Sequence, residues 1–277
     1  MYLALCLAVF LATYLLNIVT ITVGYHRGLA HRAVRLAPWA QRALVATGNW
    51  ITGLDPKAWV VMHRLHHAHA DTPLDPHSPA NVGLLGIAAE QLRSYKRVIV
   101  GLARRDPAYT RHAVDLDFPL SRLNTSGLWY LPYLAHAVVG VALGASVGWL
   151  LGAAYFAGMM SHPAQGGLVN ALGHAVGGRN FDTDDDSRNN HLAAWLVLGE
   201  GFQNNHHRHP ASARFSYLAH EVDLGWGACL ALDAAGVISI QRESLMPRPE
   251  RRSWATASSR VARRPRSVGP APRAVRG

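Results

Sequence analysis

Residues Met1 to Tyr25 form the first long apolar stretch of the chain and contain no Asp, Glu, Lys or Arg. About 20 such residues cross the hydrocarbon core of a bilayer as a helix, so we expect a transmembrane span near residues 3–24. A cleaved signal peptide would show a basic segment before the apolar run and a small-residue cleavage site after it. The sequence shows neither, which favours a span.

A second uncharged stretch covers residues 123–178. It is long enough for two spans, and the small residues at 144–148 make a weak break in it. We therefore expect a helical hairpin with spans near 127–143 and 147–165. The apolar segment 43–54 is too short to span, and we expect it either at the membrane interface or packed beneath the site.

The positions of arginine and lysine indicate the orientation of these spans. One group follows the first predicted span, a second precedes the hairpin and a third follows it, so with three spans all of them lie on one side. The positive-inside rule makes that side the cytoplasm. Arg is used far more often than Lys, which is typical of GC-rich bacterial genomes. We therefore expect an integral protein of the bacterial inner membrane whose histidine-rich segments face the cytoplasm.

The composition agrees with a membrane protein. Only 16% of the 277 residues are charged, whereas soluble domains carry about 25%. The net charge of +10 does not indicate nucleic-acid binding, because most of it lies in residues 242–277, which are rich in Arg, Pro and Ser. We expect this segment to be a disordered tail that can touch anionic lipid, after a membrane domain of residues 1–241.

Sixteen histidines dominate the candidate chemistry, whereas two cysteines are too few for a thiolate metal site. Many of the histidines gather in four short segments, two of which begin with Asn or Gln. The segments are His26-Arg27-Gly28-Leu29-Ala30-His31, His63-Arg64-Leu65-His66-His67, Asn170-Ala171-Leu172-Gly173-His174 and Gln203-Asn204-Asn205-His206-His207. Histidines such as His77 and His162 have no partner at ligand spacing, and we expect them to be capping or solvated residues.

The spacing within these segments indicates shared helix faces. His63, His66 and His67 stand at i, i+3 and i+4, so three imidazoles lie on one face of a helix. Adjacent residues of a helix point about 100° apart. Neighbouring histidines such as His206 and His207 can therefore serve two different metals.

In the first segment, His26 and His31 stand at i and i+5 and do not share a face of an α-helix, so a regular α-helix would not bring both to one site. We expect a bend at Gly28 to bring both to the site. The four segments then supply eight imidazoles without a thiolate or carboxylate. Imidazole suits Zn, Cu, Fe and Ni, and eight is too many for one tetrahedral site, so the count indicates two metals. Nitrogen ligation beside a membrane favours paired iron that activates O₂.

Over residues 3–216 the chain resembles the membrane fatty acid desaturase family, in particular the bacterial type of its acyl-CoA desaturase branch. The resemblance rests on GYHRGLAHR (24–32), HRLHHAHADTPLDPHSP (63–79), N-x-x-x-H (170–174) and GEGFQNNHHRHPASARFS (199–216). The DPHSP and GEG segments separate this branch from alkane and sterol hydroxylases. The expected fold is an all-α integral membrane protein whose transmembrane helices carry a cytoplasmic helical cap with a histidine-rich di-metal site.

The resemblance also implies a di-iron centre and its ligands. One iron takes five histidines, namely His26, His31, His63, His67 and His206. The second iron takes His66, His174 and His207, with Asn170 holding a water. The family has a further histidine on that iron at the first position of the third box, where this chain has Gln203. A glutamine carbonyl oxygen binds such a metal more weakly than imidazole, so we expect the second site to be the weaker one.

The reaction that the family implies removes two hydrogens from neighbouring methylenes of a long acyl chain and forms a cis double bond, with O₂ as co-substrate. The acyl chain is carried as a thioester, on CoA or a carrier protein, or in a lipid. Two electrons come from a separate ferredoxin, rubredoxin or cytochrome b5-like donor, because the sequence holds no flavin, haem or iron–sulfur motif. Trp59 resembles a tryptophan that lines the acyl tunnel of the family, and a membrane-interface anchor is the alternative.

Three other functions stay open at this stage. An acyl or lipid hydroxylase would use the same centre. A metal transporter is disfavoured, because transporters place polar ligands near the midplane of their spans, whereas here they lie at or beyond the span ends. An inactive metal-binding homologue is the third, because Gln203 departs from the family and the chain begins at what resembles the second of two spans that usually precede the first box. Either another span precedes this sequence, or there are three spans.

Overall fold

The first apolar segment folds as one continuous helix. In the computed structural model, which describes residues 1–247, α1 (Tyr2–Val19) continues without a break into the π-helix η1 (Thr20–Ala30). Within those residues, this 29-residue helix is the only one long and apolar enough to cross a membrane. It ends at the first histidine segment.

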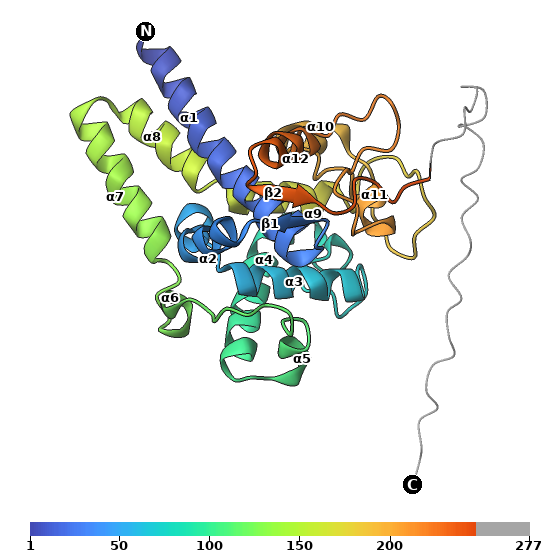
Figure 1. Ribbon diagram of the computed structural model, residues 1–277. Coiled ribbons are helices and arrows are strands. Elements are labelled where there is room, and N and C mark those ends of the chain that lie inside the picture. Colours follow the sequence, from blue (N-terminus) through green and yellow to red (C-terminus); the bar gives the residue numbers. More distant parts are fainter. Residues whose placement is uncertain (248–277) are drawn as a thin grey trace. The chain divides into compact units, whose positions relative to one another are not determined.

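The second uncharged stretch contains a helical hairpin. α7 (Leu131–Ser146) and α8 (Trp149–Met159) are joined by a short turn, and α8 lies between α7 and α1 (Figure 1). Glycine allows this close approach, since a Cβ at Gly152 would clash with the carbonyl oxygen of Gly140 on α7. Small residues at helix contacts are typical of helix pairs in membranes.

The lengths of these helices differ from the predicted spans near 127–143 and 147–165. α7 and α8 contain 16 and 11 residues, fewer than the about 20 that a span needs. The chain turns after α8, and α9 (His162–Leu172) starts anew with Pro163 in its first turn, where proline costs no helical hydrogen bond. Of the three predicted spans, only the first is a single helix of sufficient length in the described part of the chain.

The helices of this part expose large apolar side chains. Leu3 and Leu7 on α1 are 71% and 58% exposed, and Val138 on α7 and Trp149 on α8 are 61% and 67% exposed. Exposed apolar surface that extends over several helices marks contact with a membrane or with another protein.

Three further helices position the histidines, and they are α2 (Pro38–Thr52), α3 (Pro56–His69) and α4 (Pro79–Ala103). α2 includes most of the apolar segment 43–54 and packs against η1, α3 and α7. Gly53, with φ of +76°, ends α2 in the left-handed conformation that favours glycine. Asp55 then caps α3 by accepting a hydrogen bond from the N–H of Ala58 at 3.0 Å.

Short elements complete the described chain. The helices are α5 (Pro107–Thr110), α6 (Arg122–Thr125), α10 (His191–Leu196), α11 (Gln203–Arg208) and α12 (Leu224–Ala234). The strands β1 (Val34–Leu36) and β2 (Ile238–Ile240) pair antiparallel, with Val34 opposite Ile240. The fold is mostly helical, as predicted, but the all-α description is wrong in this detail. The two-stranded sheet ties the segment after η1 to the segment after α12.

We predict that the tail starts after residue 241, but the next residues still form hydrogen bonds with the membrane-domain part of the chain. The carbonyls of Arg242 and Glu243 accept hydrogen bonds from the backbone N–H groups of Ala213 and Arg214, at 2.8 and 2.9 Å. The compact unit accordingly runs from Met1 to Met246. The predicted tail from residue 248 onward lies outside the described residues.

These hydrogen bonds should make the effect of truncation depend on its position. Removal of residues 242–277 deletes both of them, and at about 0.5–1.5 kcal/mol each the unfolding temperature should fall by roughly 2–12 °C. Removal of residues 248–277 should leave it unchanged. Thermal unfolding of both truncated proteins in detergent, beside the full chain, tests this, and equal unfolding temperatures would contradict it.

Candidate metal centre

Four segments of the chain bring all eight predicted histidines into two adjacent clusters. The helices η1, α3 and α11 carry most of them, and one lies just after the end of α9. The residues are His26 and His31 from the end of η1, His63, His66 and His67 from α3, His174 after α9, and His206 and His207 from α11.

The π-helix explains why His26 and His31 face the same way. Its hydrogen bonds join residues five apart, as in the 3.1 Å bond from the N–H of His31 to the carbonyl of His26. The wider turn brings residues i and i+5 closer to the same side of the helix than an α-helix does, and the two ring centroids are 4.9 Å apart. The expected bend at Gly28 is therefore wrong, since Gly28 lies within the continuous helix.

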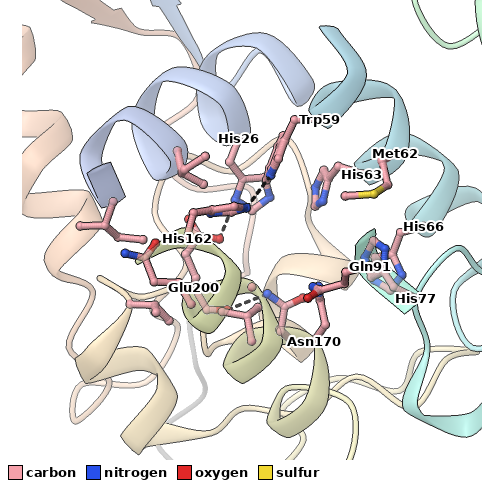
Figure 2. Close-up of a pocket in the computed structure, with 17 residues that line it drawn as sticks. His26, Trp59, Met62, His63, His66, His77, Gln91, His162, Asn170 and Glu200 are labelled. Atoms are coloured by element: carbon pink, nitrogen blue, oxygen red, sulfur yellow. Dashed lines mark hydrogen bonds and ion pairs between the residues drawn. The ribbon is translucent and has the colours of Figure 1, made fainter. Parts of the chain in front are cut away.

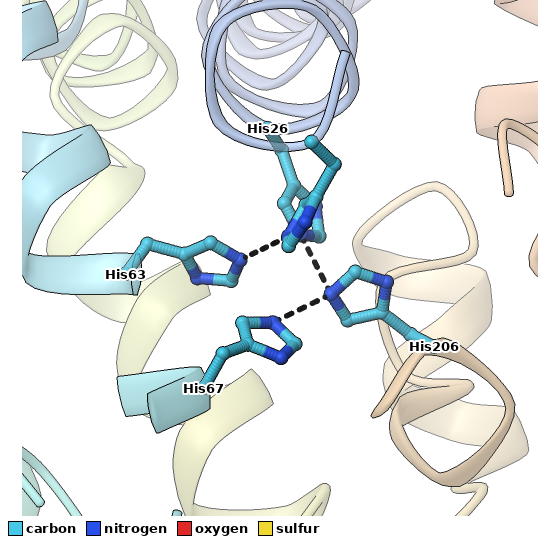
Figure 3. Close-up of side chains that lie close together, drawn as sticks. His26, His63, His67 and His206 are labelled. Carbon is cyan, nitrogen blue, oxygen red and sulfur yellow. Dashed lines mark hydrogen bonds between the residues drawn. The ribbon is translucent and has the colours of Figure 1, made fainter. Parts of the chain in front are cut away.

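The first cluster contains five imidazoles whose ligand atoms all lie within 4.8 Å of one another. Nε2 of His206 is 3.0 Å from Nε2 of His26 and 2.9 Å from Nε2 of His67. The Nε2 atoms of His31 and His63 are 2.7 Å apart. Figure 3 shows that the rings of His26, His63, His67 and His206 reach inward from three segments toward a common point.

The second cluster contains His66, His174 and His207, again with ligand atoms within 4.8 Å of one another. Nε2 of His66 is 3.3 Å from Nε2 of His207. Nε2 of His174 is buried and has no hydrogen-bond partner in residues 1–247. The rings of His207 and His67 have centroids 4.5 Å apart, so the two clusters are neighbours.

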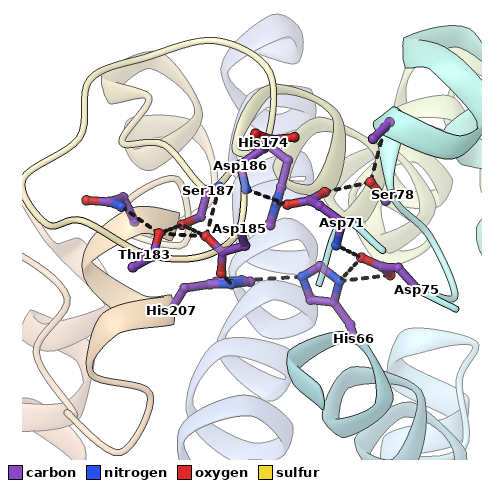
Figure 4. A network of polar contacts seen from close by, with 12 residues as sticks. His66, Asp71, Asp75, Ser78, His174, Thr183, Asp185, Asp186, Ser187 and His207 are labelled. Carbon is purple, nitrogen blue, oxygen red and sulfur yellow. Dashed lines mark hydrogen bonds and ion pairs between the residues drawn. The ribbon is translucent and has the colours of Figure 1, made fainter. Parts of the chain in front are cut away.

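Carboxylates hold four of these rings from outside, each at its Nδ1 atom (Figure 4 shows three of the four pairs). The pairs and their distances are His26 with Glu200 at 2.6 Å, His66 with Asp75 at 2.9 Å, His174 with Asp71 at 2.8 Å and His207 with Asp185 at 2.6 Å. Second partners of this kind fix the ring orientation of metal-ligating histidines and raise their basicity.

These contacts determine which ring nitrogen carries the proton. An ionised carboxylate only accepts, so the Nδ1–H groups donate and the Nε2 atoms keep their lone pairs. His66 and His207 therefore direct two lone pairs at each other across 3.3 Å. Two acceptors at this distance repel, and a cation between them removes the repulsion. The donor sets thus fit metals that imidazole binds.

Burial favours the neutral, metal-binding form of several of these imidazoles. Desolvation by burial, followed by the neighbouring imidazoles, lowers the pKa of His63 and His206 well below 6.5. Burial also lowers the pKa of His207 to about 4, although the hydrogen bond to Asp185 opposes this shift. Burial would raise the pKa of Asp185 itself, but its hydrogen bond with His207 leaves that pKa lowered, so the carboxylate stays ionised.

A fully buried ion-pair network supports the first cluster. The Arg27 guanidinium donates to Glu200 at 2.9 Å and to Asp223 at 3.2 Å, and it lies over the ring of Phe215 at 3.7 Å. Glu200 therefore joins Arg27 to the Nδ1 atom of His26. Because the guanidinium offsets the charge of the carboxylates, the network stabilises buried ions that would each be costly alone.

A cavity lined by histidines of both clusters lies beside them (Figure 2). His26, His63 and His66 line it beside apolar side chains that include Ile18, Ile21, Met62, Val169 and Val197. Trp59 lies in its wall, where its Nε1–H donates to Nε2 of His162 at 3.3 Å. Trp59 is only 8% exposed, which argues against the alternative of a membrane-interface anchor.

Comparison with known proteins places these clusters within a known family. The family of fatty acid desaturases, as represented by its sequence profile, matches residues 2–223, most of the chain that carries the clusters. The chain belongs to the fatty acid desaturase family. The predicted family, and with it the prediction of an oxidoreductase, is confirmed.

Relatives of this desaturase are identical to it at about a third of the aligned positions. It is 32% identical to "Hex-5-enoyl-[acyl-carrier protein] acetylenase" of Moorena producens (strain JHB), over 80% of this chain and 72% of that protein. It is 31% identical to "sn-1 stearoyl-lipid 9-desaturase" of Anabaena variabilis, over 78% and 76%. It is 32% identical to "sn-2 palmitoyl-lipid 9-desaturase" of Nostoc sp. (strain 36), over 84% and 80%.

Two further predicted ligands of the desaturase, Asn170 and Gln203, lie in the cavity wall together with His66. Gln203 is 3% exposed, and its Nε2 donates to the carbonyl of Glu200 at 2.6 Å. This bond uses the amide nitrogen and leaves Oε1 as the atom that could meet a metal. No hydrogen bond joins Asn170 or Gln203 to the three imidazoles of the second cluster in the described chain, so their role as ligands stays a prediction.

Sequence reasoning missed several residues of the desaturase site. His77 and His162, which we expect from sequence to be capping or solvated, are buried and line the cavity, and the His77 ring stacks on His66 at 4.8 Å. The outer carboxylates were also missed. Asp75 lies in the DPHSP segment and Glu200 in the GEG segment, so the motifs that carry the resemblance contain them, but no spacing rule assigns them to a histidine.

The Arg27 network generates a stability prediction. Arg27→Met leaves Glu200 and Asp223 buried without their cation, so the free energy of unfolding should fall by about 3–5 kcal/mol. Arg32→Met is the matched control, because Arg32 is exposed and its ion pair with Asp115 is worth about 0–1 kcal/mol. Denaturant unfolding of the purified variants measures both values, and equal losses would contradict the role of Arg27.

Proposed function

We propose that this chain is an O₂-dependent fatty acyl desaturase that introduces a cis double bond into a long acyl chain at a di-iron centre. The observation that carries the proposal is a cavity, lined in part by aliphatic side chains, that opens directly on both histidine clusters. An acyl chain in this cavity would place its methylenes beside both metals. Membership of the fatty acid desaturase family supports the class of substrate.

Each of the two clusters would hold one iron. The first iron would be held by His26, His31, His63, His67 and His206, and the second by His66, His174 and His207, with Gln203 Oε1 and a water on Asn170 completing it. Bound iron supplies the oxidising power that removes hydrogen from an unactivated C–H bond. The protein contributes the rest, because the outer carboxylates orient the rings and the apolar wall excludes water.

The names of the relatives support two forms of the substrate. Two of them are named for acyl chains in lipids and one for an acyl chain on acyl-carrier protein. We propose a long acyl chain in a lipid or as a thioester of CoA or a carrier protein. Trp59 would position it, since its ring stacks on His63 with centroids 5.0 Å apart and so forms the wall beside the first cluster.

The proposed location is the bacterial inner membrane, with the site on the cytoplasmic side. The span of α1 and η1 leads directly to His26, and α1, α7 and α8 expose the apolar side chains that lipid would cover. Two electrons per turnover would come from an external ferredoxin, rubredoxin or cytochrome b5-like protein, because the sequence carries no redox-cofactor motif of its own.

Metal content tests the di-iron assignment. The full chain, purified in detergent with iron supplied, should hold two irons. His67→Ala should retain about one and lose activity, because it removes a ligand of the first cluster. His69→Ala is the matched control on the same helix and should retain two. A parent protein with about one metal, or an active His67→Ala variant with two, would contradict the assignment.

Product analysis tests the reaction. In a desaturase-deficient host, the chain should produce monounsaturated acyl chains with one double-bond position, as located by mass spectrometry. Trp59→Ala should widen the range of positions, because it removes the cavity wall beside His63, whereas Trp129→Ala, remote from the cavity lining, should not. Hydroxylated products would favour the hydroxylase alternative, and a two-iron protein without any product would favour an inactive homologue.

A further inference from the structure

The two clusters differ in their outer partners as well as in their number of imidazoles. All three rings of the second cluster donate from Nδ1 to a separate aspartate, at 2.9 Å for His66, 2.8 Å for His174 and 2.6 Å for His207. Among the five rings of the first cluster, only His26 has a carboxylate partner in the described chain. The cluster with fewer ligands thus has more anions around it.

The carboxylates of the two clusters also differ in whether a basic side chain is paired with them. Glu200, the carboxylate of the first cluster, also pairs with the Arg27 guanidinium at 2.9 Å, so its charge is offset within the protein. In residues 1–247 no arginine or lysine forms an ion pair with Asp71, Asp75 or Asp185. The second cluster therefore has three carboxylates around three imidazoles, and none of these carboxylates is paired with an arginine or lysine in the described chain.

The aspartates of the second cluster are held firmly by neighbouring groups (Figure 4). Asp75 accepts from the N–H groups of Asp71 and His77, at 2.8 and 2.9 Å. Asp71 accepts from the hydroxyl of Ser78 at 2.5 Å and from the N–H of Asp186 at 2.8 Å.

Asp185 is held in the same way, since it accepts from the hydroxyl of Thr183 at 2.7 Å and from the N–H of Ser187 at 3.1 Å. Carboxylates held by such donors keep their charge and their orientation. Each can therefore act on its histidine without first being ordered by a metal.

We propose that this shell of three aspartates makes the second cluster the tighter of the two metal sites, although it has three imidazoles against five. Each aspartate raises the basicity of the imidazole that it orients, and all three attract a cation at short range, Asp75 from a buried position and Asp71 and Asp185 from half-buried ones. The shell thus offsets the absence of an imidazole at Gln203. The inference rests on the proposed di-iron function, and it reverses the order of affinities that the ligand count alone predicts.

The test uses the full chain loaded with Fe(II) under anaerobic conditions and measures the release of iron to a chelator over time. The parent should release one iron quickly and one slowly. His31→Ala removes a ligand of the first cluster and should keep the slow phase, whereas His174→Ala removes a ligand of the second cluster and should lose it.

Isosteric variants then test the aspartates themselves. Asp185→Asn and Asp71→Asn remove one charge each and should accelerate the slow phase by about 10–100-fold, the usual effect of an outer partner on metal affinity. Asp184→Asn is the control, because Asp184 is exposed and makes no side-chain hydrogen bond within the described residues, and it should change neither phase. Asp185→Glu keeps the charge and should restore much of the slow release.

The other outcomes contradict either the proposed order of metal affinities or the proposed di-iron function. A slow phase that disappears in His31→Ala, equal release of both irons, or Asp185→Asn behaving as Asp184→Asn does would overturn the inference while leaving a di-iron enzyme intact. A parent chain that binds fewer than two irons would instead contradict the proposed function. The Mössbauer spectrum of each ⁵⁷Fe-loaded variant before chelation shows whether the other site is still formed, so a misfolded protein is recognised.

Discussion

The repulsion between imidazole lone pairs is the constraint on which the rest of this structure depends. Eight buried or half-buried rings converge, and four pairs of their Nε2 atoms are 2.7–3.3 Å apart. Carboxylates outside the clusters fix the protons of four rings on the nitrogen that faces away from the cluster. Neutral rings in this arrangement are not a stable core by themselves. The helices, caps and ion pairs around them hold a geometry that a bound cation stabilises.

Buried ion pairs between distant segments of the chain hold the rings in this arrangement. Arg27 follows His26 in the same helix, and its guanidinium pairs with Glu200 and Asp223 from the C-terminal part of the described chain. Glu200 in turn orients His26. The first cluster and the junction between η1 and the segments around α11 and α12 therefore form together. The same junction places the cavity beside the α1–η1 helix and both histidine clusters.

Much of this arrangement could be predicted from the sequence. The spacing at His63, His66 and His67 and the uncharged run before His26 are local patterns, so the shared helix face and the first long apolar helix could be predicted from them. The division of eight histidines between two clusters came from the resemblance. The π-helix at His31 was not predictable, because nothing in its composition distinguishes it from an α-helix. The aspartate partners were missed for another reason, since Asp71 and Asp185 meet their histidines only through tertiary contacts.

The central claim is that the converging Nε2 atoms form two separate metal sites. An anomalous-scattering map from crystals of the iron-loaded protein tests it most directly. The account predicts two iron peaks, one among His26, His31, His63, His67 and His206 and one among His66, His174 and His207. A single peak, or an iron bound outside these imidazoles, would contradict it.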